Sequence, residues 1–181
     1  MEMNRILLFI LLCCCGVLSA QSRKRVEVST DIAMFLPAAA GAVVAAVEKD
    51  YQGFWQLVGS GTASVATAYA LKYTVSKERP DGSDSHSFPS NHAGVAFVGA
   101  TFLQQRYGWK FAVPAYAVAG YVAWGRVYAR RHDTWDVLAG AVLGTGCAML
   151  FTTPFARKYN LSFVPFATQR CDVGVHLSAS F

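Results

Sequence analysis

Five long apolar runs follow one another along the chain, separated by short polar links. They cover residues 32–47, 51–71, 87–105, 111–125 and 137–156, and none contains a formally charged side chain. A helix needs about 20 apolar residues to cross a bilayer, with a range of about 17 to 25. The second, third and fifth runs are therefore long enough to span. The first and fourth would span only if flanking residues were included.

This pattern predicts an all-α fold: a membrane helical bundle of five to six helices in one domain over residues 31–156. The alternative is that the runs are buried helices of a soluble all-α protein, in which runs of 15 or 16 apolar residues also occur. Five such runs in succession favour membrane spans. Small residues such as Gly59, Ser60 and Gly61 would let helices approach closely in lipid.

The two ends of the chain differ from this bundle. Residues 1–20 are typical of a signal peptide or signal anchor, with Arg5 before an apolar stretch and "LSA" at its end. Cleavage after Ala20 is the favoured interpretation, and an uncleaved anchor is the alternative. Residues 157–181 form a C-terminal tail of unknown role, whose last residues alternate between apolar and polar side chains.

Composition agrees with a membrane protein and restricts its partners only weakly. Hydrophobic residues make up 54% of the chain and charged residues 15%, against about 25% charged residues in a typical soluble protein. The formal net charge of +5 shows only that anions are not repelled. We expect the membrane and its lipids as partners and no nucleic acid, and the oligomeric state stays open.

If the runs cross the membrane in turn, two of the polar links lie on the same face. The link 106–110 is on one side, and the links 76–88 and 126–134 are on the other. The ends of the second and fourth runs then meet the starts of the third and fifth. The export signal places this convergent face outside the cytoplasm, since Lys and Arg counts do not decide the orientation.

Three polar clusters fall on the convergent face, and the first contains two cations. Lys72 and Arg79 are seven residues apart, about two turns if the helix continues, and Pro80 then ends it. Two cations at one helix end would bind a small oxyanion. The alternative is that both are interfacial side chains at the end of a span.

The second cluster is "PSNH", at the start of the third run. A helix beginning here would offer backbone N–H groups at Asn91 and His92 and a positive dipole end, which together suit an anion. Ser90 would otherwise be a plain N-cap. A histidine beside such a site could donate a proton to a leaving oxygen.

The third cluster is "RVYARRHDTWD". His132 and Asp136 are four residues apart, so on a helix the carboxylate could hold one imidazole nitrogen and leave the other free to attack. Arg126 could add a third cation. The alternative is a helix-initiating aspartate with a surface histidine nearby.

Together the clusters supply two histidines, one carboxylate and three cations, the set that phosphoryl transfer without a metal requires. The order Lys-x6-Arg-Pro, Pro-Ser-x-His and Arg-x5-His-x3-Asp over residues 72–136 resembles the type 2 phosphatidic acid phosphatase (PAP2) superfamily, and the resemblance extends over residues 51–154. It implies a PAP2-like helical core, with neither a metal nor another cofactor.

The resemblance also implies a role for each residue. His132 would be the nucleophile that forms a phosphohistidine, Asp136 would orient it, and His92 would be the general acid and later the base. The phosphate would be held by five groups: Lys72, Arg79, Ser90, the Asn91 backbone N–H and Arg126.

Two positions depart from the family pattern. Asn91 stands where glycine is usual, and Gly125 stands where serine is usual, so the resemblance specifies the reaction more closely than the substrate. Several other polar residues have no assigned role. Asp81, Asp84 and His86 suit a metal or, more simply, a solvated turn, and Lys77, Arg130 and Arg131 suit a head group or second phosphate.

The sequence therefore predicts a bacterial lipid phosphatase of the inner membrane, with its active site facing the periplasm. The candidate substrates are lipid A, undecaprenyl diphosphate, phosphatidylglycerophosphate and phosphatidate. Three alternatives stay open: a soluble periplasmic acid phosphatase for small phosphomonoesters, a vanadium haloperoxidase, and a non-catalytic membrane scaffold or transporter.

Overall fold

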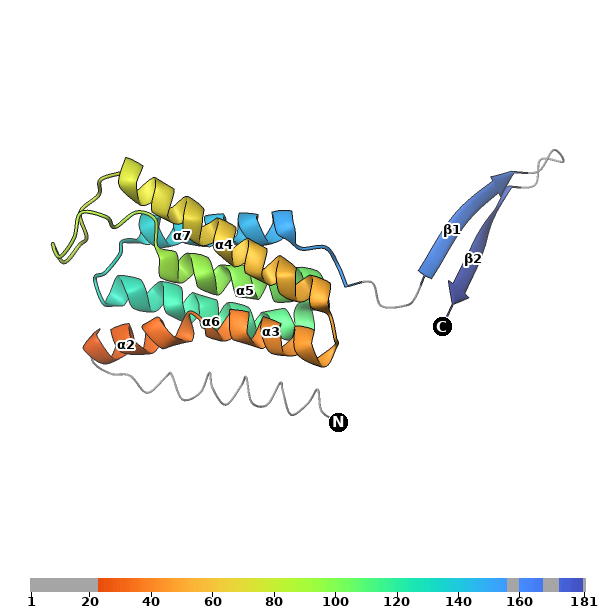
Figure 1. Ribbon diagram of the computed structural model, residues 1–181, viewed down its shortest axis with the longest axis horizontal. Helices are drawn as coiled ribbons and strands as arrows, with labels where there is room; N and C mark the ends of the chain where they lie inside the picture. The colour runs from red at the N-terminus through yellow and green to blue at the C-terminus, as the bar shows by residue number, and fades with distance from the viewer. Residues whose placement is uncertain (1–22, 156–159, 168–172, 181) are drawn as a thin grey trace.

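The computed structural model describes residues 23–155, 160–167 and 173–180. The predicted signal peptide or anchor, residues 1–20, lies outside the described residues. The described chain forms a helical bundle followed by two strands (Figure 1). The helices are α2 (Arg23–Ala33), α3 (Leu36–Val47), α4 (Tyr51–Thr74), α5 (Asn91–Tyr107), α6 (Trp109–Tyr128) and α7 (Thr134–Phe151).

Helix α5 lies in the middle of the bundle and packs against α3, α4, α6 and α7 (Figure 1). This arrangement confirms the predicted all-α class. The two strands, β1 (Asn160–Ala167) and β2 (Val173–Ser180), belong to the tail and pair antiparallel. The alternation in the tail therefore corresponds to a strand, and a second strand precedes it.

Local sequence signals set most of the helix ends. The Asp50 side chain caps α4 by accepting a hydrogen bond from the Gly53 N–H, and Ser90 caps α5. Pro37 lies in the first turn of α3, where it has no helical N–H to lose, and a turn separates α3 from α2. Gly108, with φ of 91°, ends α5 and opens α6. The first apolar run is thus part of two helices.

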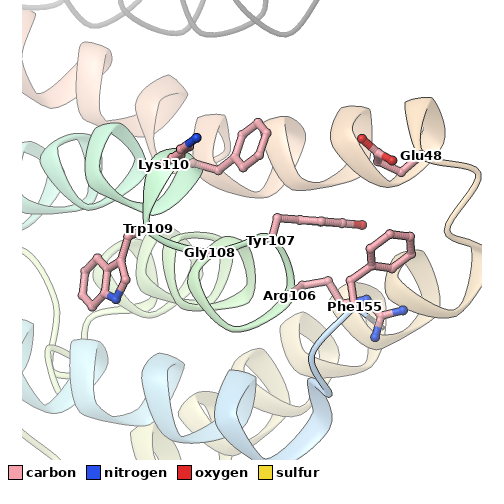
Figure 2. A pocket seen from close by; sticks show the side chains of 8 residues that line it. Glu48, Arg106, Tyr107, Gly108, Trp109, Lys110 and Phe155 are labelled. Carbon is pink, nitrogen blue, oxygen red and sulfur yellow. The ribbon is translucent and has the colours of Figure 1, made fainter. Parts of the chain in front are cut away.

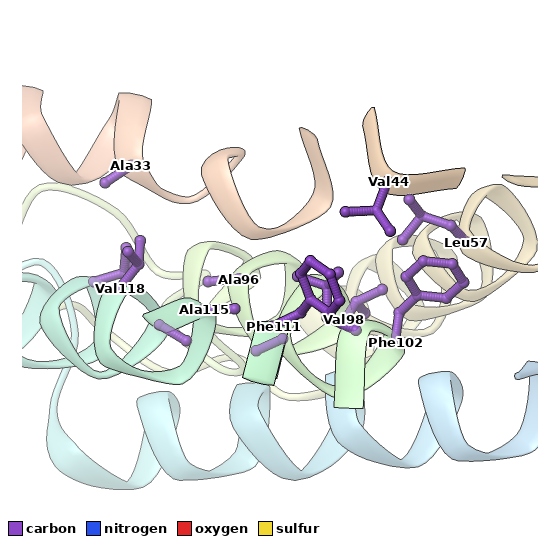
Figure 3. Packing of buried hydrophobic residues seen from close by; sticks show 13 residues of the cluster. Ala33, Val44, Leu57, Ala96, Val98, Phe102, Phe111, Ala115 and Val118 are labelled. Carbon is purple, nitrogen blue, oxygen red and sulfur yellow. The ribbon is translucent and has the colours of Figure 1, made fainter. Parts of the chain in front are cut away.

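The hydrophobic core cluster has members on every helix from α2 to α6. Its fully buried members on α5 include Val98 and Phe102, and α6 contributes Phe111 and Val118 (Figure 3). Many of the remaining members are alanines. Small side chains let helices approach closely, which is how helices associate where lipid removes the hydrophobic driving force.

Two glycines bring α7 against the backbone of α5. A Cβ atom at Gly140 would lie 2.3 Å from the Ser90 carbonyl oxygen, and one at Gly144 would lie 2.2 Å from the Gly94 carbonyl oxygen. Both distances are far shorter than a van der Waals contact. Any side chain at either position would therefore push the first turn of α5 away from α7.

The outside of the bundle carries large apolar side chains. All four tryptophans are exposed, as are Leu150 at 85% and Val142 at 72%. Within the described residues, two helical segments are long and apolar enough to cross a membrane, namely Arg23–Val47 and Thr134–Phe151. A bundle with this apolar surface is suited to a membrane rather than to water.

These two segments differ in part from the runs expected to span. The fifth run largely overlaps the candidate span Thr134–Phe151. The first run is long enough to cross a membrane because the helical segment that contains it begins at Arg23. Helix α4 contains the second run and α5 contains most of the third run, but neither helix is among the candidate spans. The 17 residues of α5 are also fewer than the 19 of its run, since Ser87–Ser90 lie in the preceding link.

The predicted convergence of helix ends is confirmed. The ends of α4 and α6 lie at the same end of the bundle as the starts of α5 and α7 (Figure 1). The Ser90 N–H donates to the Asp136 carbonyl at 2.9 Å, and the Lys72 ammonium donates to the His86 carbonyl at 2.8 Å. The three polar clusters therefore meet.

Candidate active site

A buried histidine and a buried carboxylate lie at the start of α7. Asp133 caps this helix and forms a capping box with Asp136, in which each side chain accepts a hydrogen bond from the other residue's backbone N–H. His132, 3% exposed, directly precedes the cap, and Asp136 is fully buried. The need to cap α7 thus fixes the carboxylate close to the imidazole.

The Ser87 hydroxyl lies between these two side chains. It donates a short hydrogen bond to Asp136 Oδ2 and lies 3.4 Å from His132 Nδ1. The two side chains themselves are 3.6 Å apart, between His132 Nδ1 and Asp136 Oδ2, too far for a hydrogen bond. The direct bond expected from their four-residue spacing is absent because His132 lies in the bend before α7 and not on the helix.

Lys77 holds the other side of the carboxylate. Its Nζ lies 2.7 Å from Asp136 Oδ1 and 2.5 Å from Asp133 Oδ2. Burial opposes the charge on Lys77, but the two carboxylates outweigh it and raise the pKa of the ammonium group. Lys77 therefore belongs to the hydrogen-bond network that holds Asp136 next to His132. Neither Lys77 nor Ser87 is three or four residues from Asp136 in the sequence, so the sequence did not predict their contacts with it.

The three cations reach this end of the bundle from three elements. Lys72 is buried in the last turn of α4, and Arg126 is buried in the last turn of α6. Arg79 comes from the link, since α4 ends at Thr74. The helix does not continue to Arg79, so the condition for the two-turn spacing of the two cations is not met; the link instead pairs back on itself through the Lys77 and Arg79 N–H groups. The Nε atoms of Arg79 and Arg126 are buried with no acceptor among the described residues.

The start of α5 brings the second cluster to the same place. Ser90 accepts a hydrogen bond from the Ala93 N–H at 3.5 Å, so its hydroxyl is the helix cap. Asn91 Oδ1 is buried without a donor in the described part of the chain. His92 Nε2 lies 2.9 Å from Asp31 Oδ1, which also contacts Arg126. Asp31 belongs to α2, and no sequence motif pointed to it.

His132 is held in its neutral form. The pKa of His132 falls to about 3, first because the ring is buried and then because three cations lie near it, namely Arg126, Lys72 and Arg79. Asp136 opposes this shift but does not overcome it. A pKa below the ordinary histidine value of about 6.5 leaves the imidazole unprotonated and nucleophilic at neutral pH.

We expect the ring of His132 not to titrate across the usual histidine range in the substrate-free protein. In NMR spectra of histidine-labelled protein, its ring signals should keep the neutral chemical shifts from about pH 8 to about pH 5. The signals are assigned by their loss in His132→Gln. A titration midpoint near the ordinary value of about 6.5 would contradict the buried, cation-flanked environment.

Four other polar residues of the links, namely Asp81, Asp84, His86 and Arg131, make contacts within the protein. Arg131 bonds to Glu27 of α2 at 2.7 Å and to Asp81 at 3.0 Å, while Asp84 pairs with His86 at 3.1 Å. The backbone of Arg130 has a positive φ of 59°. In the ranges described, no group of three or more His, Cys, Asp or Glu residues is arranged to hold a metal ion.

A pocket of about 420 Å³ lies at the opposite end of the bundle, around the turn between α5 and α6 (Figure 2). It is lined by Glu48, Arg106, Tyr107, Gly108, Trp109, Lys110, Phe111 and Phe155. The Arg106 guanidinium is already paired with Asp50, at 2.6 Å and 2.7 Å. Because it lies at the opposite end of the bundle, this pocket is remote from the two histidines and takes no part in their chemistry.

Comparison with known proteins identifies the family. Residues 53–159, more than half of the chain, match the PAP2 superfamily. The chain belongs to the PAP2 superfamily. This confirms the predicted family and its class of enzyme, a phosphoric ester hydrolase.

Individual relatives agree with the PAP2 assignment. The chain is 34% identical over 139 residues to the lipid A 4'-phosphatase of Helicobacter pylori strain J99, covering 71% of this chain and 70% of the relative. It is 38% identical over 78 residues to the lipid A 1-phosphatase of Porphyromonas gingivalis, covering 41% of this chain and 18% of the relative. The predicted bacterial lipid phosphatase branch of PAP2 is thereby confirmed.

A solved structure supports the PAP2 fold. The crystal structure of Aquifex aeolicus LpxE superposes with a TM-score of 0.53 at 20% identity, covering 66% of this chain and 83% of that one. The structure also accounts for Gly125, which replaces the serine usual in PAP2. A Cβ atom there would lie 2.5 Å from Thr30 Cγ2 of α2, so the glycine makes room for that helix.

Proposed function

We propose that the protein removes a phosphate group from lipid A through a phosphohistidine intermediate. The observation that supports this most directly is the pair of buried arginine Nε atoms, of Arg79 and Arg126, without acceptors among the described residues. A buried donor without a partner costs about 1–3 kcal/mol, so a bound phosphate oxygen would relieve that cost. Relatives named lipid A phosphatases suggest which phosphate it is.

His132 is the nucleophile of this proposal. Its Nδ1 faces Ser87 and Asp136, which leaves Nε2 to attack phosphorus. His92 takes up a proton when the anionic substrate binds beside it. As the N–P bond forms, the bond between phosphorus and the sugar oxygen breaks, and His92 donates this proton to the leaving oxygen. Water then attacks phosphorus, the N–P bond to His132 breaks, His92 accepts a proton from the water, and inorganic phosphate leaves.

The charge of the transferring group is stabilised by Lys72, Arg79 and Arg126, together with the N–H groups at the start of α5. Ser90 is oriented by its cap bond, and Asn91 offers a backbone N–H in the first turn. Three fixed cations around one phosphoryl group supply the electrostatic stabilisation for which other phosphatases use a metal ion.

Activity is therefore expected to persist when metals are removed. After incubation with EDTA and desalting, the rate of phosphate release should stay within about twofold of the untreated rate. The measurement is a phosphate assay on purified protein in metal-free buffer. A loss of activity that Mg²⁺, Mn²⁺ or Zn²⁺ restores would show that the cations alone are not sufficient.

The membrane provides the substrate. The two apolar helical segments and the exposed tryptophans favour residence in a bilayer, where a phosphorylated lipid can approach the end of the bundle that carries the two histidines. We propose the bacterial inner membrane with the active site facing the periplasm. The support for this side is the predicted export signal at residues 1–20.

The test is phosphate release by purified protein from a panel of lipids, with His132→Ala measured in parallel. The panel contains lipid A, undecaprenyl diphosphate, phosphatidylglycerophosphate, phosphatidate and a water-soluble aryl phosphate. Mass spectrometry of the lipid A product distinguishes loss of the 4'-phosphate from loss of the 1-phosphate. Preference for the aryl phosphate would favour the soluble acid phosphatase alternative, and no release from any substrate would favour the non-catalytic one.

A further inference from the structure

A carboxylate from α2 contacts two of the residues to which the proposed function assigns roles. Asp31 Oδ1 lies 2.6 Å from Arg126 Nη1 and 2.9 Å from His92 Nε2. Helix α2 precedes residues 53–159, the part that matches PAP2. A role for Asp31 is therefore separate from the motifs that identify the family, although it rests on the proposed function of His92 and Arg126.

The position of Asp31 is fixed by how α2 packs. Val26 and Thr30 of α2 are fully buried, and both lie against Gly125, the residue before Arg126. Glu27 of the same helix bonds to Arg131 at 2.7 Å. These contacts hold α2 beside the last turn of α6, so the Asp31 carboxylate meets Arg126 because the helix is anchored there.

The surroundings of Asp31 Oδ1 are those that a phosphate oxygen needs. One oxygen atom accepts from a guanidinium and contacts an imidazole nitrogen, and charge-assisted bonds of this kind are the strong ones. The Asp31 side chain is 47% exposed while that of Arg126 is 4% exposed. The carboxylate therefore lies on the open side of the site, where a substrate would enter.

We propose that Asp31 occupies the position of a substrate oxygen in the empty enzyme, holds His92 and Arg126 in place, and is displaced when phosphate binds. The charged groups that face His92 are Asp31 from α2, Arg126 from α6 and Arg79 from the link. A carboxylate and a phosphate repel one another, so they do not share the same two donors. Because the displaced carboxylate moves toward solvent, the exchange needs no rearrangement of the core.

This makes Asp31 a positioning residue that acts on binding and not on bond breaking. Its contact with Arg126 must be given up before phosphate takes its place, which weakens the apparent affinity for every anion at the site. Substrate and inorganic phosphate are affected alike, since both need the same two donors. The step after binding proceeds without Asp31.

The test uses the full chain in detergent and inorganic phosphate as the probe. In Asp31→Asn, we expect the inhibition constant for phosphate and the KM for lipid to fall about tenfold, and kcat to stay within about threefold. Titration calorimetry with phosphate measures the same change without turnover. If the wild-type protein releases phosphate from no lipid, the proposed function fails while the calorimetry still tests Asp31.

Glu48→Gln is the matched control, because it also removes one negative charge but lies in the pocket at the opposite end of the bundle. It should leave the phosphate affinity within about twofold. An unchanged affinity in Asp31→Asn, or an equal gain in Glu48→Gln, would overturn the proposal. If Asp31→Asn does not yield folded protein by thermal unfolding, Asp31→Ser removes the same carboxylate and is measured in its place.

Discussion

Replacing His132 with alanine is expected to reduce kcat for phosphate release by about 10³-fold or more. Without a nucleophile, no phosphoenzyme forms, and only direct attack by water in the positively charged site remains. The wild-type protein, quenched in alkali after brief reaction with phosphate-labelled lipid, should carry label on histidine. The variant should carry none, while its KM changes little because the three cations are intact.

His86→Ala is the matched control for this experiment. His86 is on the same face of the bundle, but its ring contacts Asp84 and Tyr73 instead of the histidine–carboxylate pair. Phosphate release by this variant should stay within about threefold of wild type. Retained activity in a folded His132→Ala variant would mean that another residue, or water, attacks the phosphate.

Replacing Asp136 with asparagine is expected to affect both activity and stability. The amide cannot accept from Lys77, Ser87 and the Asp133 N–H together as the carboxylate does. We expect kcat to fall by about 10²- to 10⁴-fold, because the Ser87 hydroxyl beside His132 Nδ1 loses its carboxylate acceptor and the imidazole loses a nearby negative charge. The free energy of unfolding should fall by about 2–4 kcal/mol, because the buried position of Asp136 loses its charge and the partly exposed Lys77 loses one of its two anionic partners.

The double variant Lys77→Met/Asp136→Asn separates the two effects. Removing the ammonium also removes its need for a partner, so thermal unfolding should show the double variant more stable than Asp136→Asn alone. Its activity should stay as low as that of the single variant. Recovery of activity together with stability would show that Asp136 acts only by holding the fold.

The sequence predicted the parts of the site that lie at regular positions relative to helix ends. The uncharged runs predicted the helices of the bundle. The three motifs at the ends of these runs predicted that His92, Arg126 and His132 lie at the same end of the bundle. The boundaries were less well predicted, because charged residues were treated as ends of helices. Helix α6 continues past Arg126 to Tyr128, since Asp31 neutralises that arginine inside the bundle.

What the sequence did not predict depends on contacts between distant segments. Ser87 and Lys77 lie in a link without periodicity and reach Asp136 only because the link folds over α7. Asp31 reaches His92 only because α2 packs on α6, and nothing in the spacing of residues 23–33 indicates that contact. Loop conformation and helix packing decide these positions, and neither is encoded in a local pattern.

The backbone contact between α5 and α7 has a mechanical consequence. His92 lies in the first turn of α5 and Asp136 in the first turn of α7, and at Gly140 and Gly144 the two helices have no room for a side chain between them. A thicker or thinner bilayer changes the tilt of a whole bundle at a modest energetic cost, whereas separating two close-packed backbones costs far more. The separation between His92 and Asp136 is thus insulated from the thickness of the surrounding membrane.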